Sequence, residues 1–249
     1  MTTTGPRARY REQTRAEIKA VALGQLAEGG IPAIALTRIA KELELSGPAL
    51  YRYFANRDGL LDALIGDAYQ ALAEAVGEAA EVSAKYTPRQ RLRSLAGACR
   101  AWAVQQPHRF LLIAGSPLPG YTAPPETLGQ ARAALGPFLP LFASARPSPA
   151  VLPVVEQMTA WERRDPAVAA WVTEYVDASD RTRHAGGALA GAVMAWTRIH
   201  GAVGLEVNGQ FNDMGHDPQT LLDAEMGALA DSFGLTRPVT RRAESWPPD

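Results

Sequence analysis

The sequence predicts an all-α fold with an N-terminal three-helix helix-turn-helix head, at 1–57, and a larger helical body, at 58–235. Apolar residues recur at three- and four-residue steps in many segments, as they do on one face of an α-helix. Residues 37–54 have the pattern of two short helices joined by a tight turn. Of 249 residues, 47% are apolar, which is ample for a core. The polar tail at 236–249 is expected to be disordered.

The head begins with a helix predicted from about residue 11 to residue 28, where Gly29 and Gly30 end the apolar pattern. Thr37 is placed to cap the next helix and to offer its hydroxyl to a phosphate. The turn at 43–46 contains no glycine, so we expect one of its residues to adopt a left-handed conformation, at a cost of roughly 1–2 kcal/mol.

The second helix of the motif has a start signal, because Ser46 can cap it and Pro48 falls in its first turn. Leu50 and Phe54 are four residues apart and are predicted to point inward. The opposite face then carries Pro48, Ala49 and Arg52, flanked by Tyr51 and Tyr53. Small groups at the start and hydrogen-bonding groups further along suit a helix that enters the major groove of DNA.

Charge is distributed unevenly along the chain, although the total is only −1. Through Arg57 there are nine basic and five acidic residues, so the head carries +4 and the remainder −5. A basic head on an acidic body directs DNA to one end. Arg7 and Arg9 are interpreted either as an arm that reaches into the minor groove or as part of a solvated tail.

The body is predicted to consist of helices only. Asn56 is expected to cap a long fourth helix, whose apolar stripe runs from Leu60 to Val76 and extends past the head. Further helices are predicted at about 88–107, 108–114, 126–145, 151–158, 168–176, 181–206 and 218–233. Candidates for lining an apolar ligand pocket are Trp102, Phe110, Tyr121, Phe138, Phe142, Met158, Trp161, Trp171 and Tyr175, although aromatics at helical spacing are also typical of a plain core.

The last two helices are the predicted partner surface. Gly187, Gly191 and Ala195 repeat every four residues, which makes a flat stripe that another backbone can approach closely. The alternative is tight packing within one subunit. The final helix contributes Leu222, Met226 and Leu229 to this predicted dimer interface.

Catalytic and metal chemistry have little support in the sequence. There is no glycine-rich phosphate loop with a placed lysine, no G-x-S-x-G and no H-E-x-x-H, and the four histidines lack metal-ligand spacing. Cys99 is the only cysteine, so no intrachain disulfide can form. We expect no catalytic residue, no metal and no cofactor. The absence of a long apolar run predicts a cytoplasmic, nucleoid-associated protein without a membrane anchor.

The head resembles the DNA-binding domain of the TetR family of bacterial regulators. The similarity rests on TRIA at 37–40 and on SGPALYRYFANRDGLL at 46–61. It implies a homodimer on double-stranded DNA, with Ser46, Gly47, Pro48 and Tyr51 near base edges and Ala49 also on the DNA-binding surface. Thr37, Arg38, Tyr53 and Arg57 would contact phosphates. Arg52 could contact either a base edge or a phosphate.

The body resembles a subset of this family with a distinctive C-terminal domain. The similar segments are PHRF at 107–110, GSPLPGY at 115–121 and AWTRIHG at 195–201. The resemblance implies that the last two helices form a four-helix dimer interface and that the body binds a small apolar or aromatic effector. The favoured interpretation is a repressor of a palindromic operator that the effector releases.

Two other interpretations stay open from the sequence. The chain could be an activator or a ligand-independent DNA-binding protein with the same head. It could also be a helical protein–protein adaptor that has lost DNA binding, which Glu44 and Gly47 within the motif make conceivable.

Overall fold

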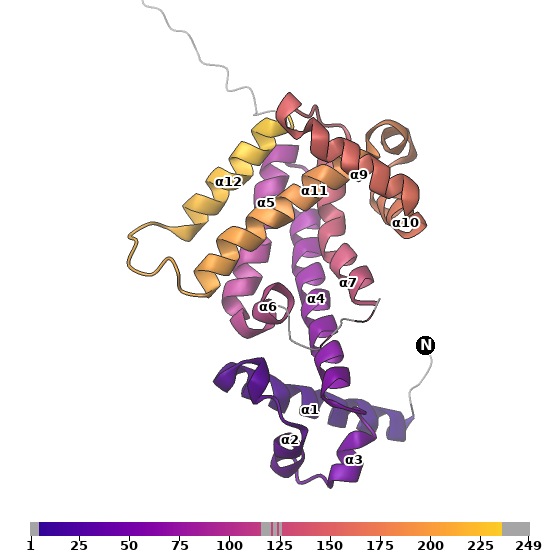
Figure 1. Cartoon of the computed structure of the whole chain (residues 1–249), viewed down its shortest axis with the longest axis vertical. Coiled ribbons are helices and arrows are strands. Elements are labelled where there is room, and N and C mark those ends of the chain that lie inside the picture. Colours follow the sequence, from indigo (N-terminus) through magenta and orange to yellow (C-terminus); the bar gives the residue numbers. More distant parts are fainter. Residues whose placement is uncertain (1–4, 116–120, 122–123, 125, 236–249) are drawn as a thin grey trace, which may run out of the picture. The chain divides into compact units, whose positions relative to one another are not determined.

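The computed structural model describes residues 5–115, 121, 124 and 126–235, and the backbone alone for 178–184. Within these residues every regular element is a helix, which confirms the all-α prediction. The α-helices are α1 (Pro6–Gly29), α2 (Leu36–Glu42), α3 (Gly47–Tyr51), α4 (Arg57–Val82), α5 (Pro88–Gln105), α6 (Pro107–Ala114), α7 (Glu126–Leu135), α8 (Leu139–Ala143), α9 (Leu152–Arg164), α10 (Pro166–Tyr175), α11 (Ala178–Val207) and α12 (Pro218–Ser232) (Figure 1). Short 3-10 turns lie at Ile31–Ala33 (η1), Gly136–Phe138 (η2) and Pro149–Val151 (η3).

The chain contacts group into two compact units. The first contains 1–76, 99–134 and 200–215, and the second contains 77–98, 135–199 and 216–249. The first unit therefore holds the helix-turn-helix together with α6, so its limits differ from the sequence boundary at residue 57. The predicted tail at 236–249 lies outside the described residues.

The core of the first unit joins the head helices to the start of α4. Its buried members come from α1, α2, α3, α4 and the segments that link them: Ile18, Ala22, Leu26, Ile34, Ile39, Ala40, Leu50, Phe54, Leu60, Leu61 and Leu64. Leu112 of α6 and Tyr121 pack against the same cluster. The stripe predicted for the fourth helix is thus buried as expected, and Asn56 caps α4 by accepting the Gly59 N–H at 2.8 Å.

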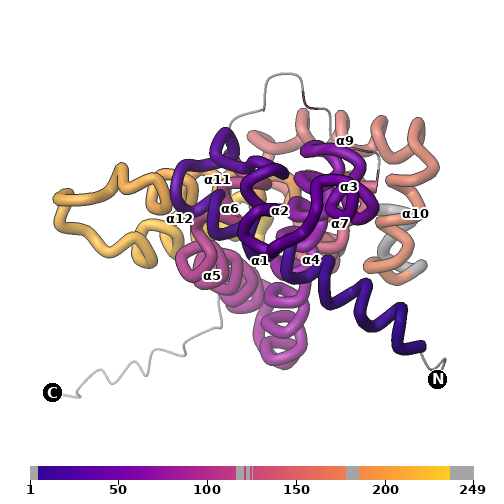
Figure 2. The backbone as a smooth tube through the Cα atoms, turned by 90° about the horizontal axis from the view of Figure 1, so that it is seen from below, coloured from indigo at the N-terminus to yellow at the C-terminus, as the bar shows by residue number. Residues whose placement is uncertain are grey.

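The motif is fixed on α1 by polar contacts as well. Lys19 of α1 pairs with Asp67 of α4 at 2.6 Å. The buried Gln25 accepts a hydrogen bond from the Ala35 N–H, at 3.0 Å, at the residue that precedes α2. In Figure 2 α2 and α3 lie against α1, and the observed contacts link α1 to α2 and α2 to α3. The start of α2 is therefore set by α1.

The second unit is built around α11. The single helix predicted at 126–145 is broken, because Gly136 and Pro137 form η2 and separate α7 from α8. The side chains of Phe142 and Phe233 meet edge to face, with ring centroids 4.9 Å apart. Gly186 lets α11 approach α9 closely, since a Cβ there would lie 2.7 Å from the Val155 carbonyl oxygen.

Across the described ranges, no helix combines the length and the apolar character needed to cross a bilayer.

Candidate nucleic-acid interface

Helix α3 presents one face to solvent and buries the other. The Ser46 hydroxyl accepts the Ala49 N–H at 3.3 Å, which confirms the predicted cap. Leu50 and Phe54 are 1% and 3% exposed, whereas Tyr51 is 52% exposed. A Cβ placed on Gly47 would meet nothing within 4 Å. The outer face is therefore open to a partner, as predicted, although Ala49 and Tyr53 are half-buried.

The turn of the motif contains the predicted left-handed residue. Glu44 has φ of 53°, and the next residue, Leu45, donates its N–H to the Ala40 carbonyl at 2.9 Å. This closure lets the chain reverse between α2 and α3 without a glycine. A helix-turn-helix is therefore formed at the expected position.

Arg15 of α1 orients the end of α3. Its Nη1 donates to the Tyr53 carbonyl at 2.9 Å, and its guanidinium lies 4.2 Å from the centroid of the Phe54 ring. The cation–π contact and the hydrogen bond hold the segment that follows α3 against α1. The two helices consequently present one continuous surface.

A basic cradle lies on that surface. Arg7, Tyr10 and Arg11 from α1 and Arg52 and Tyr53 from the end of α3 line a hollow of about 290 Å³. The three guanidinium groups can only donate hydrogen bonds, and the two phenol hydroxyls can donate as well. Phosphate oxygens accept hydrogen bonds, so this set of groups suits a phosphate. The described part of the chain places no carboxylate among these five lining residues.

The cradle corrects the prediction for the N-terminal arginines. Arg7 and Arg9 belong to α1, which begins at Pro6, so neither lies on an extended arm or tail. Arg7 contributes to the cradle and Arg9 is exposed outside it. Tyr10 and Arg11 were not predicted as site residues. The sequence prediction started this helix at about residue 11. A start at Pro6 would have placed Arg7, Tyr10 and Arg11 on one helical face, because they are three and four residues apart.

One further prediction for the head, the helix cap at Thr37, needs correction. Thr37 is the second residue of α2 and does not cap it, because the helix starts at Leu36 and Ala35 is the N-cap. Its exposed hydroxyl is still open to a phosphate. Arg38 is also exposed, but it pairs with Glu28 at 2.6 Å, so DNA would have to compete with that carboxylate.

Arg57 has an internal role in this structure. Its Nε donates to the Ile34 carbonyl at 3.1 Å, and its Nη2 donates to the Ile31 carbonyl at 2.5 Å. These bonds fasten η1 to the first residue of α4. The guanidinium is thus turned toward the head's own main chain, and the phosphate contact of Arg57 stays a prediction.

The predicted dimer stripe is filled from within the chain. A Cβ on Gly191 would lie 2.0–2.4 Å from atoms of the Phe142 ring, and the nearest neighbour of Gly187 is the Phe142 carbonyl. Ala195 is fully buried. On α12, Leu222, Met226 and Leu229 are 0–1% exposed. These six residues therefore pack inside one subunit, which was the alternative interpretation.

The predicted pocket aromatics are divided between the two units. Trp102, Phe110 and Tyr121 belong to the first unit, and Phe138, Phe142, Met158, Trp161, Trp171 and Tyr175 belong to the second. Phe138 and Phe142 are buried in the packed core, and Tyr175 fills the space beside Gly136. Phe110 stacks edge to face with Trp102 and His200. Aromatic composition alone did not distinguish core from cavity.

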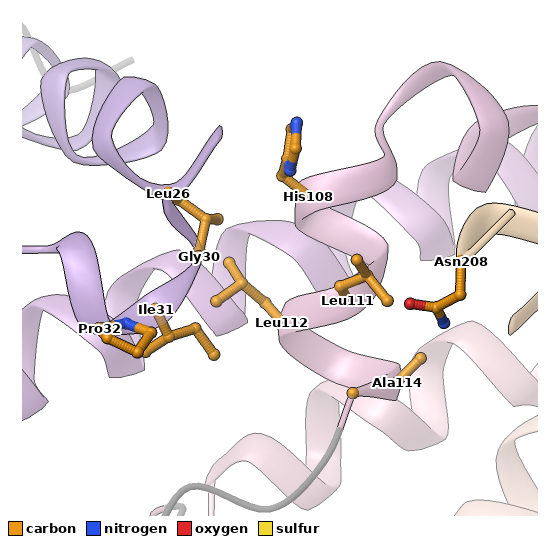
Figure 3. Close-up of a pocket in the computed structure, with 10 residues that line it drawn as sticks. Leu26, Gly30, Ile31, Pro32, His108, Leu111, Leu112, Ala114 and Asn208 are labelled. Atoms are coloured by element: carbon orange, nitrogen blue, oxygen red, sulfur yellow. The ribbon is translucent and has the colours of Figure 1, made fainter. Parts of the chain in front are cut away.

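A cavity of about 420 Å³ lies in the first unit, between the head and α6 (Figure 3). It is lined by Leu26, Gly30, Ile31, Pro32, His108, Leu111, Leu112, Ala114, Gly115 and Asn208. None of the nine predicted pocket residues contributes to it. The sequence did not predict this cavity, because its lining residues come from segments that are far apart in the chain and meet only in the fold.

Two of the family-like segments, 107–110 and 195–201, contact each other beside this cavity. His200 of the AWTRIHG segment bonds through Nε2 to the Ala114 carbonyl at 2.9 Å, and its ring lies 6.1 Å from that of Phe110. Arg100 and Glu206 form two hydrogen bonds of 2.7 and 2.6 Å nearby. The His200 contacts attach α6 to α11, and the Arg100–Glu206 pair attaches α5 to the end of α11.

Comparisons with known proteins agree with this architecture. The family described as bacterial regulatory proteins, tetR family, matches residues 18–64, and the tetracyclin repressor-like C-terminal domain matches residues 92–229. HTH-type transcriptional regulators Rv1816 of Mycobacterium tuberculosis and Mb1846 of Mycobacterium bovis are each 32% identical over 229 residues, which cover 90% of this chain and 94% of theirs.

Solved structures extend the comparison to the fold. The crystal structure of the regulatory protein SCO4313 superposes with a TM-score of 0.71 and 36% identity, covering 91% of this chain and all of that one. A protein from Rhodococcus sp. RHA1 has a TM-score of 0.61 at 21% identity, covering 90% of this chain and 95% of that one.

Proposed function

We propose that this chain, which belongs to the TetR family of bacterial transcriptional regulators, is a repressor that binds a palindromic operator as a homodimer. The observation that carries the proposal is the open outer face of α3 beside the arginine cradle. The head supplies both elements that sequence-specific binding needs, namely groups for base edges and groups for phosphates.

The exposed face of α3 is assigned to base readout. Ser46, Gly47 and Pro48 are exposed at its start, and Tyr51 is half exposed one turn later. Such a helix enters the major groove with its N-terminal residues against the bases. Because Gly47 has no side chain, we assign most of the discrimination to Tyr51 and to the close approach that Gly47 permits.

Phosphate contacts are assigned to the cradle and to α2. Arg7, Arg11 and Arg52 converge on one hollow, so a single phosphate can be approached from two helices. The Tyr53 ring forms part of the same hollow, and Thr37 is exposed at the start of α2. These contacts fix the register of the head on the duplex without reading sequence.

We assign the dimer interface to the exposed faces of α11 and α12. Within the second unit, Thr197 is exposed on α11, and Thr220, Ala224 and Ala228 are exposed at four-residue spacing on α12. Arg198 holds the helices together by donating to the Glu225 carbonyl at 3.2 Å. Small and apolar outer faces on two adjoining helices suit self-association about a twofold axis.

A charge placed on this surface tests the assignment. Ala224→Arg is expected to convert the dimer to a monomer and to weaken operator binding, because the two copies of the charge would meet across the axis. Ala160→Arg on the exposed face of α9 is the matched control and should leave the mass unchanged. Sedimentation velocity measures both masses. A dimeric Ala224→Arg variant would remove the interface from these faces.

Release by a small effector is part of the proposal. A ligand that binds one conformation of the protein better than the operator-competent one lowers operator affinity by population shift. Family membership supports this regulation.

Selection from a random DNA pool tests the function directly. The wild-type protein should enrich a palindrome at moderate salt, whereas Tyr51→Ala should enrich none. Equal enrichment by both proteins would remove α3 from the reading surface. No enrichment by either would favour a protein–protein adaptor.

A further inference from the structure

We propose that the cavity between the head and α6 is the effector site, that its ligand is a compact uncharged molecule with one hydroxyl group, and that occupancy lowers operator affinity. The inference rests on the proposed function. It differs from the sequence prediction of an aromatic pocket, because aliphatic groups of the helix-turn-helix domain itself form one wall of the cavity.

The walls of the cavity determine the class of ligand. Leu26, Ile31, Leu111 and Leu112 provide an apolar lining, and none of the ten lining residues is Asp, Glu, Lys or Arg. A volume of about 420 Å³ lies in the range of small-molecule sites. Apart from the imidazole of His108, no lining side chain could offset the charge of an ion, so a neutral ligand is favoured.

Asn208 provides the polar anchor. Its Nδ2 donates to the Gly204 carbonyl at 2.8 Å, which fixes the amide at the end of α11. Among the described residues its Oδ1 has no hydrogen-bond partner, so this oxygen can accept a bond from a ligand hydroxyl. Figure 3 shows Asn208 on the side of Leu111 that faces away from Ile31. A ligand with an apolar body and one hydrogen-bond donor would therefore fit both the apolar lining and the Asn208 oxygen.

One wall of the cavity is anchored to the body helices. Ala114 is bonded to His200, and Phe110 is held between Trp102 and His200. The Arg100–Glu206 pair fixes α5 to α11 beside them. A ligand is thus unable to displace α6 easily, and the opposite wall must respond.

The opposite wall controls the geometry of the motif. Ile31 and Pro32 form η1, which leads directly into α2. The carbonyl of Ile31 accepts Arg57, and the Ala35 N–H at the end of this segment is held by Gln25. A ligand that presses on Ile31 would strain the Arg57 bond and shift the start of α2. The arrangement of α2 and α3 that fits DNA would then be less populated.

The test uses 6-bromo-2-naphthol, a neutral aromatic molecule with one hydroxyl, on the full-length protein and its selected operator. The wild-type protein should bind the operator without the probe, and saturating probe should weaken that binding by about tenfold. Anomalous scattering from a crystal soaked with the probe should place bromine against Leu26, Leu111 and Leu112.

Leu111→Trp fills the cavity, and Val104→Trp adds the same ring at an exposed position of α5 outside it. The ratio of operator affinities without and with the probe should fall to about 1 in Leu111→Trp and stay near tenfold in Val104→Trp. The ratio separates the response from any change in basal affinity. The crystal experiment on the wild type keeps the test valid if Leu111→Trp folds poorly.

Several results would overturn the inference. These are bromine elsewhere or nowhere in the crystal, an unchanged wild-type affinity with the probe, and a full response in Leu111→Trp. Failure of the wild type to bind any operator without the probe would instead overturn the proposed function.

Discussion

Gly47 of α3 and Gly191 of α11 both leave a small patch on their helix, yet only the patch around Gly47 is open. Around Gly47 there is free space for a Cβ, whereas Gly191 lies against the ring of Phe142. The difference arises from distant residues, because α8 supplies a phenylalanine to α11 and nothing covers the outer face of α3 in the described chain. A small residue is therefore a binding surface only where the rest of the chain leaves it uncovered.

The largest effect is expected from filling the α11 face. Gly191→Ala should lower the free energy of unfolding by about 3 kcal/mol, because the new Cβ overlaps the Phe142 ring in a packed core. Urea denaturation at fixed protein concentration measures the change. Gly77→Ala in α4, where a Cβ meets nothing within 4 Å, should instead be neutral or stabilising by up to about 1 kcal/mol.

A second substitution sharpens this test. Phe142→Leu in the Gly191→Ala background should recover part of the lost stability, since it removes the ring that the Cβ meets. Equal stability of the Gly191→Ala and Gly77→Ala variants would show that the α11 face is as open as that of α3.

The open face should respond in binding rather than in stability. Tyr51→Ala is expected to weaken operator binding by about 100-fold, because each of the two subunits loses base contacts worth about 1–3 kcal/mol. Its melting temperature should match that of the wild type. Tyr86→Ala is a matched control, because Tyr86 has the same exposure, 52%, and lies outside the head. Equal losses in the two variants would refute the assignment.

The two arginines at the end of the motif should separate structure from binding. Arg57→Ala should lower the free energy of unfolding by about 2 kcal/mol, since two partly buried main-chain carbonyls lose a charged donor. Thermal melting monitored by circular dichroism measures this loss. An Arg57→Ala protein that melts like the wild type would return this residue to the phosphate-binding role predicted from the sequence.

Arg52→Ala should leave stability unchanged and weaken binding to every DNA sequence. The magnitude of the slope of log affinity against log salt should fall by about 1 per chain, as expected for one lost phosphate contact. Fluorescence anisotropy across a salt series measures the slope. An unchanged slope would remove Arg52 from the cradle's phosphate contacts.

Local patterns predicted the head well. Ser46 caps α3, Leu50 and Phe54 are buried, and the turn adopts a left-handed residue at Glu44, because each depends on neighbours within a few positions. The role of Arg57 was not predictable in this way. Its carbonyl partners lie 23 and 26 residues earlier, and only the tertiary fold brings them together.

Long-range packing also explains what the sequence could not show in the body. The sequence pattern around Gly191 predicts a flat open surface. In the structure the ring of Phe142, 49 residues earlier, covers it. The cavity beside α6 combines Leu26, Leu111 and Asn208 from three separate segments, none of which has a distinctive motif. The basic cradle was partly predictable from the sequence, since Arg7 and Arg11 are about one helical turn apart.

Hydroxyl-radical footprinting on the selected operator tests the central claim most directly. The account predicts two protected segments, one for each α3, whose centres are about 34–36 Å or a multiple of that distance apart. Both should disappear in Tyr51→Ala at the same protein concentration. A single protected segment, or unchanged protection in Tyr51→Ala, would contradict a dimer that reads DNA with the outer face of α3.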